Sequence, residues 1–366
     1  MGLFKLGQFK NFIKMEIKPY QWVEAYSLTP SRLSIFARKT TLVGYKSYEP
    51  TTLKNDVKDS RLENIYKGSD VATARFHNFQ ISEQARKSMQ LKINWLYFMA
   101  KSRYKKSLSG RELFNFKMNF ITLTLPSKQV HSTGFITKNV FNQFMTEIRT
   151  FYNMENFVWR LEFQKNGNVH YHIVTDTFTD FHIVQKVWNR CLNKLGYVDA
   201  YARKHSLMTL NDYVSAYSKN GATPFVVLQK RYSFGRRTNW TAPNSVDVKA
   251  VSNGKAISMY ISKYFSKKEN KNNNCNELDN IENSVGLRLW FCSRSLSKLK
   301  TISDFVEASG RDLFFIISTA KNTFKVIHDF CTSYYFSFSD LWNEAKGVVH
   351  KVLYSYAISL FYKPAT

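Results

Sequence analysis

The sequence predicts an α+β fold, and three features of its central part support this prediction. Residues 120–125 form a run of β-branched and apolar side chains that ends at a proline, as an internal strand does. Residues 137–152 repeat apolar side chains at helical spacing. Residues 157–175 form two strand-like runs on either side of an Asn-Gly-Asn sequence, which indicates a β-hairpin. A sheet packed against helices follows from these patterns.

The next elements define the expected topology. A second amphipathic helix is expected over residues 180–195, with an acidic start and Gly196 just past its end. Residues 246–251 read as the next strand, and residues 286–294 as one more. The order strand, helix, strand, strand, helix, strand is that of a ferredoxin-like antiparallel sheet with helices on one face. This topology leaves the other face of the sheet free.

The segments outside this core are expected to be helical. Residues 81–106 place Met89 and Ile93 in one apolar stripe, and the sequence from Ser303 onward is helical and aromatic in character. We expect three parts: an N-terminal extension over residues 1–110, helical from about residue 81; a core domain over 111–298 with an insertion at 197–244; and a helical C-terminal region over 299–366.

The charge of the chain points to a polyanionic partner. The sequence has 366 residues, with 53 basic and 27 acidic side chains and a formal net charge of +26. This excess is spread along the chain, and it fits DNA, RNA or an anionic membrane. No uncharged run is long enough to span a bilayer, and the apolar segment 348–362 contains His350 and Lys351. We therefore expect no membrane-spanning segment, and the choice among these polyanionic partners stays open at this point.

The cysteines predict a reducing environment. They lie at positions 191, 275, 292 and 331 and share no metal-binding or redox spacing. They are expected to be reduced thiols in a cytoplasm.

The hairpin carries a candidate metal site. Alternate side chains of a strand share a face, so His170 and His172 point to the same side and Tyr171 to the other. Glu162 joins them if it lies opposite His172, which requires an odd number of loop residues. A three-residue loop over 166–168, with a type I turn followed by an αL residue, meets this condition. A two-residue Asn-Gly turn would place Glu162 beside Tyr171 and break the site.

Gln164 lies on the same face as Glu162 and is a candidate auxiliary ligand or partner of a ligand. A histidine pair at this spacing also occurs among packed or surface residues. The metal interpretation therefore needs support from a later part of the chain.

The insertion carries a candidate DNA-binding segment. Residues 230–240 interleave cations with aromatic rings, the composition that suits phosphates and stacked unpaired bases. A solvated basic loop is the alternative. The candidate DNA-binding residues are Lys230, Arg231, Tyr232, Arg236, Arg237 and Trp240.

A pair of tyrosines is the second candidate catalytic feature. The composition of residues 255–268 favours a helix, on which Tyr260 and Tyr264 lie one turn apart on the same side. Lys263 lies beside them. Tyrosines at this spacing also occur as ordinary packing residues.

These motifs together resemble a known family. A strand at residues 120–125, then Glu162, then His170-Tyr171-His172, then the Tyr-x-x-Lys-Tyr sequence at 260–264 resembles the HUH endonucleases that initiate rolling-circle replication. The two tyrosines make the chain similar to the gene A replication proteins of small single-stranded DNA phages. The similarity covers roughly residues 115–295. Tyr171 departs from the aliphatic residue that is usual between the two histidines.

The resemblance implies a role for each motif. Glu162, His170 and His172 would hold a divalent metal. Tyr260 and Tyr264 would be the nucleophiles, with Lys263 as the motif lysine that lowers the phenol pKa or neutralises charge on the phosphate. The implied activity is nicking and rejoining of single-stranded origin DNA through a 5′-phosphotyrosine.

The cofactor and partners follow from this chemistry. Mg²⁺ prefers oxygen ligands and Mn²⁺ accepts imidazole readily, so we expect either ion to serve. No Gly-x-x-x-x-Gly-Lys-Ser/Thr sequence occurs, so unwinding is expected to come from a host helicase, with a host polymerase, in the host cytoplasm.

Three alternatives remain open from the sequence. A relaxase or transposase of the HUH superfamily shares the motifs, although relaxases usually place the tyrosine ahead of the histidines. A zinc hydrolase uses similar ligands, but its mechanism would leave Tyr260 and Tyr264 without a catalytic role. A non-catalytic basic single-stranded DNA-binding protein explains the charge, and would form no covalent adduct.

Overall fold

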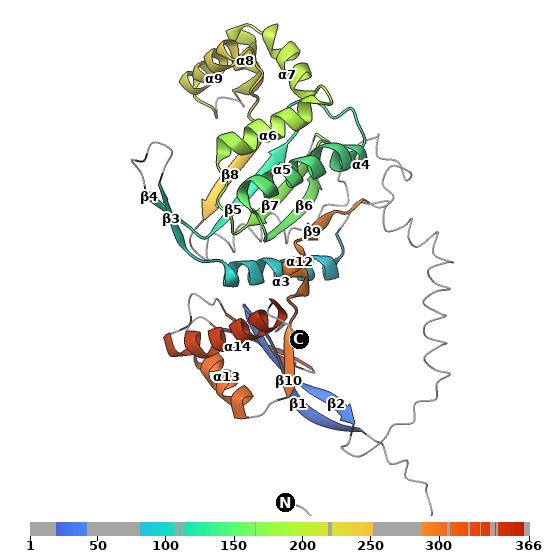
Figure 1. Ribbon diagram of the computed structural model, residues 1–366, viewed down its shortest axis with the longest axis vertical. Coiled ribbons are helices and arrows are strands. Elements are labelled where there is room, and N and C mark those ends of the chain that lie inside the picture. The colour runs from blue at the N-terminus through green and yellow to red at the C-terminus, as the bar shows by residue number, and fades with distance from the viewer. Residues whose placement is uncertain are drawn as a thin grey trace, which may run out of the picture.

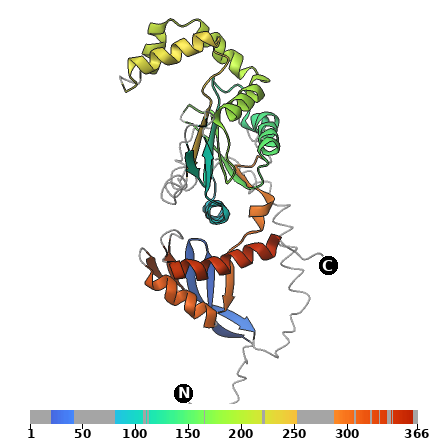
Figure 2. The same cartoon turned by 60° about the vertical axis from the view of Figure 1, so that its left-hand side comes forward.

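A computed structural model of the chain has two antiparallel sheets of five strands each and a separate pair of short strands (Figure 1). We call the sheet formed by the middle of the chain the central sheet, and the other the terminal sheet. The helix α3 (Glu83–Met99) lies between them in both views (Figure 2). The structure describes residues 20–41, 81–106, 110, 113–164, 166–218, 222–251, 287–305, 308–320, 323–329, 331–336, 341 and 343–361.

The central sheet has the strand order β8-β5-β7-β6-β9, with every neighbouring pair antiparallel. β7 lies between β5 and β6, so the two strands joined by the first helix are not neighbours. The prediction of an α+β fold with an antiparallel sheet is confirmed. The strands are β5 (Met118–Thr124), β6 (Phe157–Phe163), β7 (Val169–Thr175), β8 (Val246–Val251) and β9 (Trp290–Cys292).

Helices cover one face of the central sheet (Figure 1). The first is a continuous helical segment made of α4 (Thr133–Ile136), the π-helical turn η1 (Thr137–Phe141) and α5 (Asn142–Tyr152). The second is α6 (Phe181–Asn193), which begins where the Asp180 side chain accepts from the backbone N–H groups of His182 and Ile183. Both helices were expected, and the π-helical turn was not.

The opposite face of the central sheet is not free as expected, because α3 covers one end of it. Met89, Ile93 and Leu96 of α3 belong to one buried cluster with Phe120 of β5 and Val174 of β7. The apolar stripe of α3 is therefore buried as predicted, against a face that we expected to be open.

The helix α3 is also shorter than the predicted range of 81–106. It ends at Met99, and residues 103–106 form β3 (Arg103–Lys106), which pairs with β4 (Leu113–Phe116). The short strand β3 carries three basic residues. Its pairing partner, β4, lies beyond residue 106 and so outside the stretch in which helical spacing was read.

The insertion is a small helical unit at the end of the central sheet away from α3 (Figure 1). It contains α7 (Tyr197–Ser206), α8 (Leu210–Tyr217) and α9 (Phe225–Arg237). Tyr213, Leu228 and Trp240 form its own buried cluster. The chain then returns to the sheet as β8.

The terminal sheet corrects the expectation of purely helical N- and C-terminal extensions. Its order is β10-β1-β2-β12-β11, so the N-terminal hairpin β1–β2 lies between strands from the C-terminal part of the chain. The pairs β1–β10 and β2–β12 join residues distant in sequence, and a local pattern of side chains does not reveal such pairing. The strands are β1 (Tyr20–Thr29), β2 (Arg32–Thr41), β10 (Ile302–Phe305), β11 (Phe324–His328) and β12 (Cys331–Tyr335).

Helices α13 (Ala308–Thr319) and α14 (Asn343–Phe361) accompany the terminal sheet, and α12 (Arg294–Lys298) leads into it from β9. Leu313, Val349 and Leu353 of the two longer helices are buried in the same cluster as α3. In the part of the chain that the structure describes, no helix is long and apolar enough to cross a membrane.

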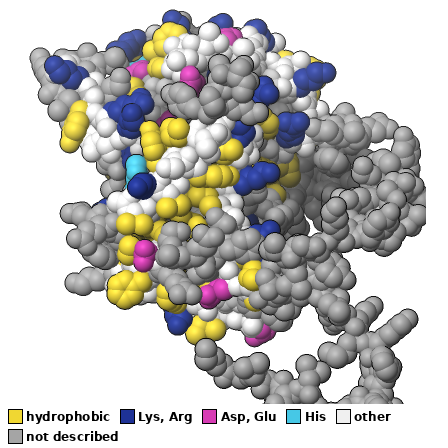
Figure 3. Space-filling model, turned by 60° about the horizontal axis from the view of Figure 1, so that its bottom comes forward, with side chains coloured by type: hydrophobic (Ala, Val, Ile, Leu, Met, Phe, Trp, Pro, Cys, Tyr) yellow, Lys and Arg dark blue, Asp and Glu magenta, His cyan; other side chains and the backbone are white. Residues whose placement is uncertain are grey.

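Basic side chains are spread over the surface. On the face drawn in Figure 3, Lys and Arg side chains occur in many places and Asp and Glu in few. This distribution agrees with the excess of positive charge in the sequence.

Candidate metal centre

The hairpin of β6 and β7 places Glu162, His170 and His172 on one face of the central sheet. Glu162 lies opposite His170, and Arg160 lies opposite His172. We expected Glu162 opposite His172, so the predicted register was wrong by two residues. Because the error is an even number, the three side chains still share a face.

The turn explains the difference in register. Gly167 has a φ of +80°, and its N–H donates to the carbonyl of Gln164 at 2.9 Å. The N–H of Gln164 donates in turn to the carbonyl of Asn168 at 2.9 Å. Three residues separate this pair, as predicted, but the loop begins one residue earlier. Glycine takes a positive φ at lower cost than asparagine, so Gly167 rather than Asn168 is the left-handed residue.

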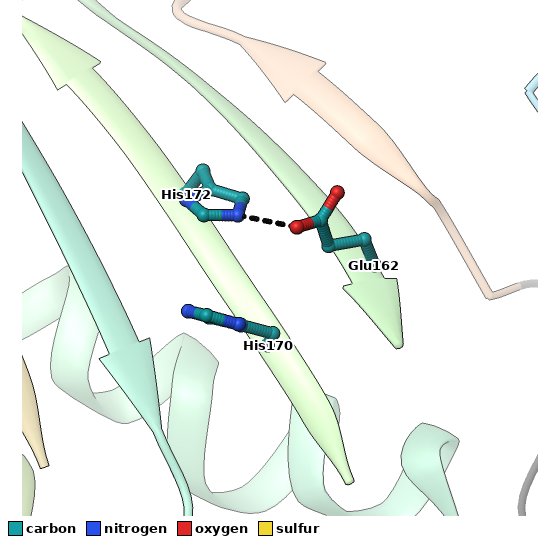
Figure 4. Close-up of side chains that lie close together, drawn as sticks. All are labelled: Glu162, His170 and His172. Carbon is teal, nitrogen blue, oxygen red and sulfur yellow. Dashed lines mark hydrogen bonds and ion pairs between the residues drawn. The ribbon is translucent and has the colours of Figure 1, made fainter. Parts of the chain in front are cut away.

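The three donors lie close enough to share one ion. Glu162, His170 and His172 offer ligand atoms that all lie within 4.8 Å of one another. The two imidazole centroids are 4.6 Å apart, and Nε2 of His172 is 2.8 Å from Oε1 of Glu162. Figure 4 shows the three side chains close together over β6 and β7, with the ring of His172 pointing to the carboxylate of Glu162. This arrangement satisfies the parity argument made from the sequence.

His170 has the burial, charge state and unpartnered nitrogen that are expected of a metal ligand. Its Nε2 atom is buried and has no hydrogen-bond partner in the described structure. Burial, and after it the neighbouring His172, lower the pKa of His170 to about 3, although the charge of Glu162 opposes the shift. The ring is therefore neutral at physiological pH. A neutral imidazole with a free lone pair is the form that binds a metal.

Glu162 is ionised in this environment. Burial raises the pKa of Glu162, but the hydrogen bond and charge of His172, with the charges of Arg160 and His170, lower it below its ordinary value overall. Arg160 is 1% exposed and lies on the same face, opposite His172. A carboxylate and two imidazoles thus meet above a buried guanidinium.

Thr122 of β5 contacts the site from the other side. β5 pairs with β7 so that Thr122 lies opposite His172, and its Oγ1 is 3.2 Å from Nδ1 of that ring. When Nδ1–H donates to this hydroxyl, Nε2 keeps its lone pair. Thr122 and Arg160 were missed in the sequence, although strand parity places Arg160 on the ligand face. Thr122 could be found only from the β5–β7 register.

Tyr171 belongs to the helix-covered face. Its ring stacks on Phe141 with centroids 4.0 Å apart, and its hydroxyl is 2.7 Å from Oγ1 of Thr137. Both partners come from the π-helical turn η1. The polar hydroxyl between the two histidines therefore has a buried partner, which accounts for the departure from an aliphatic residue.

Of the remaining predicted active-site residues, the structure describes only Gln164. Gln164 lies at the end of β6, and among the described residues no hydrogen bond joins its side chain to the three donors. Tyr260, Lys263 and Tyr264 lie outside the described residues. β8, which precedes them, is separated from β7 by β5 alone.

The predicted DNA-binding segment is a helix, α9, and its residues divide into two groups. The Tyr232 hydroxyl donates to the carbonyl of Met208 at 2.9 Å, and Trp240 is 3% exposed. We therefore correct the assignment of these two rings to base stacking, because both pack inside the insertion. The exposed cations that stay candidates for phosphate contact are Lys230, Arg231, Arg236 and Arg237.

Gly235 explains why Trp240 is buried. A Cβ at Gly235 would lie 2.2 Å from the Trp240 ring, so the ring occupies the space that a side chain would need. The Gly-Arg-Arg sequence was interpreted as part of a candidate DNA-binding segment, with a solvated basic loop as the alternative. Its glycine is the signal that marks a close approach.

One family resembles the chain over the part that holds these ligands. Residues 118–222 match the family described as replication-associated protein ORF2/G2P. The matched segment begins at β5 and includes the complete candidate metal centre and most of the insertion. It ends before β8 and before the tyrosine motif. No curated protein and no solved structure matches the chain.

Proposed function

We propose that the chain is a rolling-circle DNA replication initiator that nicks and rejoins single-stranded origin DNA through a 5′-phosphotyrosine. The observation that carries this proposal is the convergence of Glu162, His170 and His172 within a segment similar to replication-associated proteins. The position of β7 between β5 and β6 supports a ferredoxin-like HUH core, because it makes a split βαβ unit.

The donor set fits a divalent ion. Two neutral imidazoles and a carboxylate suit Mn²⁺ and can serve Mg²⁺, and the unpartnered Nε2 of His170 needs a partner at this point. Such an ion polarises and aligns a phosphate oxygen when bound. Glu162 stays ionised and His170 stays neutral, so both are in the form that binds a metal. The proton that His172 donates from Nε2 to Glu162 would move to Nδ1, where the Thr122 hydroxyl can accept it.

The tyrosines carry the covalent step in this proposal. The phenol oxygen of Tyr260 or Tyr264 attacks the scissile phosphorus in line, forming an O–P bond as the P–O3′ bond breaks. The phenolic proton passes to the departing 3′ oxygen. The bond energy is retained, so attack by a 3′-hydroxyl reverses the step and rejoins the strand. Lys263 supplies positive charge beside the phenols.

Two tyrosines four residues apart in the sequence would allow repeated rounds. One phenol holds the 5′ end while the other attacks the regenerated origin. Unwinding and synthesis belong to a host helicase and a host polymerase, and the reduced thiols fit the host cytoplasm.

The test is the capture of DNA on the polypeptide. Single-stranded oligonucleotides that tile the origin region and carry a label at the 3′ end are incubated with the protein and Mn²⁺, then separated by denaturing electrophoresis. The label on the 3′ side of the nick stays with the protein if the adduct forms. We expect Tyr260→Phe and Tyr264→Phe each to retain some nicking, and the double variant to have none.

The controls separate the nucleophiles from the metal site. Tyr104→Phe, at a side chain 69% exposed, should leave the adduct unchanged, and His170→Ala should abolish it. An adduct formed by the double variant would contradict the nucleophile assignment. Nicking without any adduct would favour a hydrolytic nuclease, and full turnover by either single variant would remove the alternation.

A further inference from the structure

We propose that the pocket between the helical insertion and the loop after β5 receives one unpaired nucleotide of the DNA strand held at the candidate metal centre. This inference rests on the proposed function, but it concerns a separate group of residues. We call this cavity the junction pocket; its volume is about 330 Å³. That volume lies within the range of pockets that bind small ligands.

The lining of the junction pocket suits a nucleotide. Tyr197, Tyr201 and Tyr217 contribute rings, and Lys128 and Lys204 contribute the charged groups. Both lysines are exposed, so their ammonium groups can meet a phosphate at the mouth. No carboxylate is among the described lining residues. Rings within and cations outside are the arrangement that binds an unpaired base with its phosphate.

The walls of the pocket are fixed in place. His205, which also lines the pocket, forms a hydrogen bond at each ring nitrogen. Nδ1 is 2.8 Å from the carbonyl oxygen of Tyr201, and Nε2 is 2.8 Å from the hydroxyl oxygen of Tyr217. Because a carbonyl only accepts, Nδ1 carries the proton and the Tyr217 hydroxyl donates to Nε2. The Tyr197 hydroxyl accepts from the backbone N–H groups of Val130 and His131 at 3.2 and 3.3 Å. A preformed pocket loses little entropy on binding.

The pocket lies at the same end of the central sheet as the metal centre. Thr124, the last residue of β5, lies opposite His170, and the pocket lining begins two residues later at Pro126. Side chains tie this loop to the hairpin: Asn168 Nδ2 donates to Ser127 O at 2.9 Å, and Val169 N donates to Gln129 Oε1 at 2.8 Å. A strand whose phosphate lies at the metal centre can therefore reach the pocket along one edge.

The exposed cations of α9 continue this path. The insertion that forms one wall of the pocket also carries Lys230, Arg231, Arg236 and Arg237 on its surface. Phosphates beyond the captured nucleotide would meet these side chains. The insertion would thus bind the part of the DNA strand that flanks the cleavage position.

The experiment measures binding without metal. Fluorescence anisotropy in EDTA follows a labelled single-stranded oligonucleotide, with four variants of the full chain. Lys128→Glu and Lys204→Glu should each weaken binding about 5-fold or more and make it less salt-dependent. Ala200→Phe, which fills the pocket without changing charge, should weaken binding and leave the salt dependence unchanged. Lys351→Glu, on exposed α14 surface, is the matched charge control and should bind nearly as the parent does.

A cross-link locates the base. Oligonucleotides with a single 5-iododeoxyuridine at successive positions are irradiated with the protein, and the cross-linked peptide is identified by mass spectrometry. We expect one position to cross-link to Tyr201 or Tyr217. Circular dichroism of each variant shows whether it is folded, and the Lys128 variant tests the pocket even if the Ala200 variant does not fold.

Three results would overturn the assignment. Unchanged affinity in both lysine variants is one, and equal affinity for duplex DNA of the same sequence is another. Displacement of the oligonucleotide by millimolar free deoxynucleotide would assign the pocket to a free nucleotide instead. The binding assay contains no metal and does not depend on cleavage. If the pocket variants lose DNA binding but the parent chain forms no tyrosine adduct, only the proposed function is rejected. A normal adduct with unaffected pocket variants would reject only the pocket.

Discussion

At the residue scale, the capacity of the candidate metal centre to bind an ion depends on which nitrogen of His172 carries its proton. Nε2–H of His172 donates to the ionised Glu162 carboxylate in the described structure, whereas a proton on Nδ1, donated to the hydroxyl of Thr122, would leave the Nε2 lone pair for a metal. Partners of this kind typically change metal affinity by about 10- to 100-fold when they are removed. Thr122 is thus a positioning residue, which acts through His172.

Thr122→Val keeps the shape of the side chain and removes its hydroxyl. We expect Mn²⁺ affinity, measured by isothermal titration calorimetry or electron paramagnetic resonance, to fall by about 10-fold or more. Thr124→Val is the matched control, because its hydroxyl donates to the carbonyl of Ser245 at 3.0 Å and not to a ligand. Equal affinities in the two variants would show that Thr122 does not orient the ring.

The residues of the site were predictable to the extent that strand parity determines them. His170, His172 and Glu162 follow from alternation within a hairpin, and a two-residue error in register leaves that alternation intact. Thr122 lies on a strand whose partner comes about 50 residues later, and no local pattern indicates which residue of β5 faces His172.

At the element scale, the insertion shows how one glycine changes which side chains of a segment are buried. Residues 230–240 read as a basic and aromatic surface segment, but Gly235 lets Trp240 enter the core of the insertion. The cations alone stay on the surface. The buried cluster of the insertion takes Leu228 from within α9 and Trp240 from beyond its end.

Gly235→Ala tests this close approach. A Cβ placed 2.2 Å from the Trp240 ring forces the ring or the helix to move, which should destabilise the insertion by about 1 to 3 kcal/mol. Thermal unfolding followed by tryptophan fluorescence measures the loss. Gly347→Ala, in exposed α14 with no atom within 4 Å of its new Cβ, should instead be neutral or stabilising. A stable Gly235 variant with an unchanged Trp240 signal would contradict this packing.

The elements of the central sheet were largely predictable, and those of the terminal sheet were not. The strand at 118–124 lies in a continuous run of largely apolar residues, and the helices after it show a helical period of apolar side chains. β1 and β2 acquire their place only by pairing with β10 and β12. A helical end to the chain was therefore the wrong expectation.

At the scale of the whole molecule, α3 unites the two five-stranded sheets. Its buried side chains belong to one cluster with residues of both, including Phe120 of the central sheet and Leu33 of the terminal sheet. The two parts therefore share a core, and the segments at either end of the chain stabilise the sheet that carries the metal centre.

Ile93→Ala tests this shared core. Removing a fully buried isoleucine side chain from α3 should cost about 2 to 5 kcal/mol and lower one common unfolding transition. Ile148→Ala, in the cluster between α5 and the central sheet, should lower the same transition in differential scanning calorimetry. Two separate transitions, of which Ile148→Ala moves only one, would show that the sheets unfold independently.

The interleaving of strands in the terminal sheet has a consequence for synthesis. β1 and β2 leave the ribosome early, but their neighbours β10 and β12 emerge only after the central sheet and the insertion. Until then Leu28 and Leu33 lack the part of their cluster that comes from the C-terminal segments, and α3 lacks the complete terminal sheet. A nascent chain that stops short of β10 is therefore a target for proteolysis, and stable protein accumulates only from ribosomes that have passed this point.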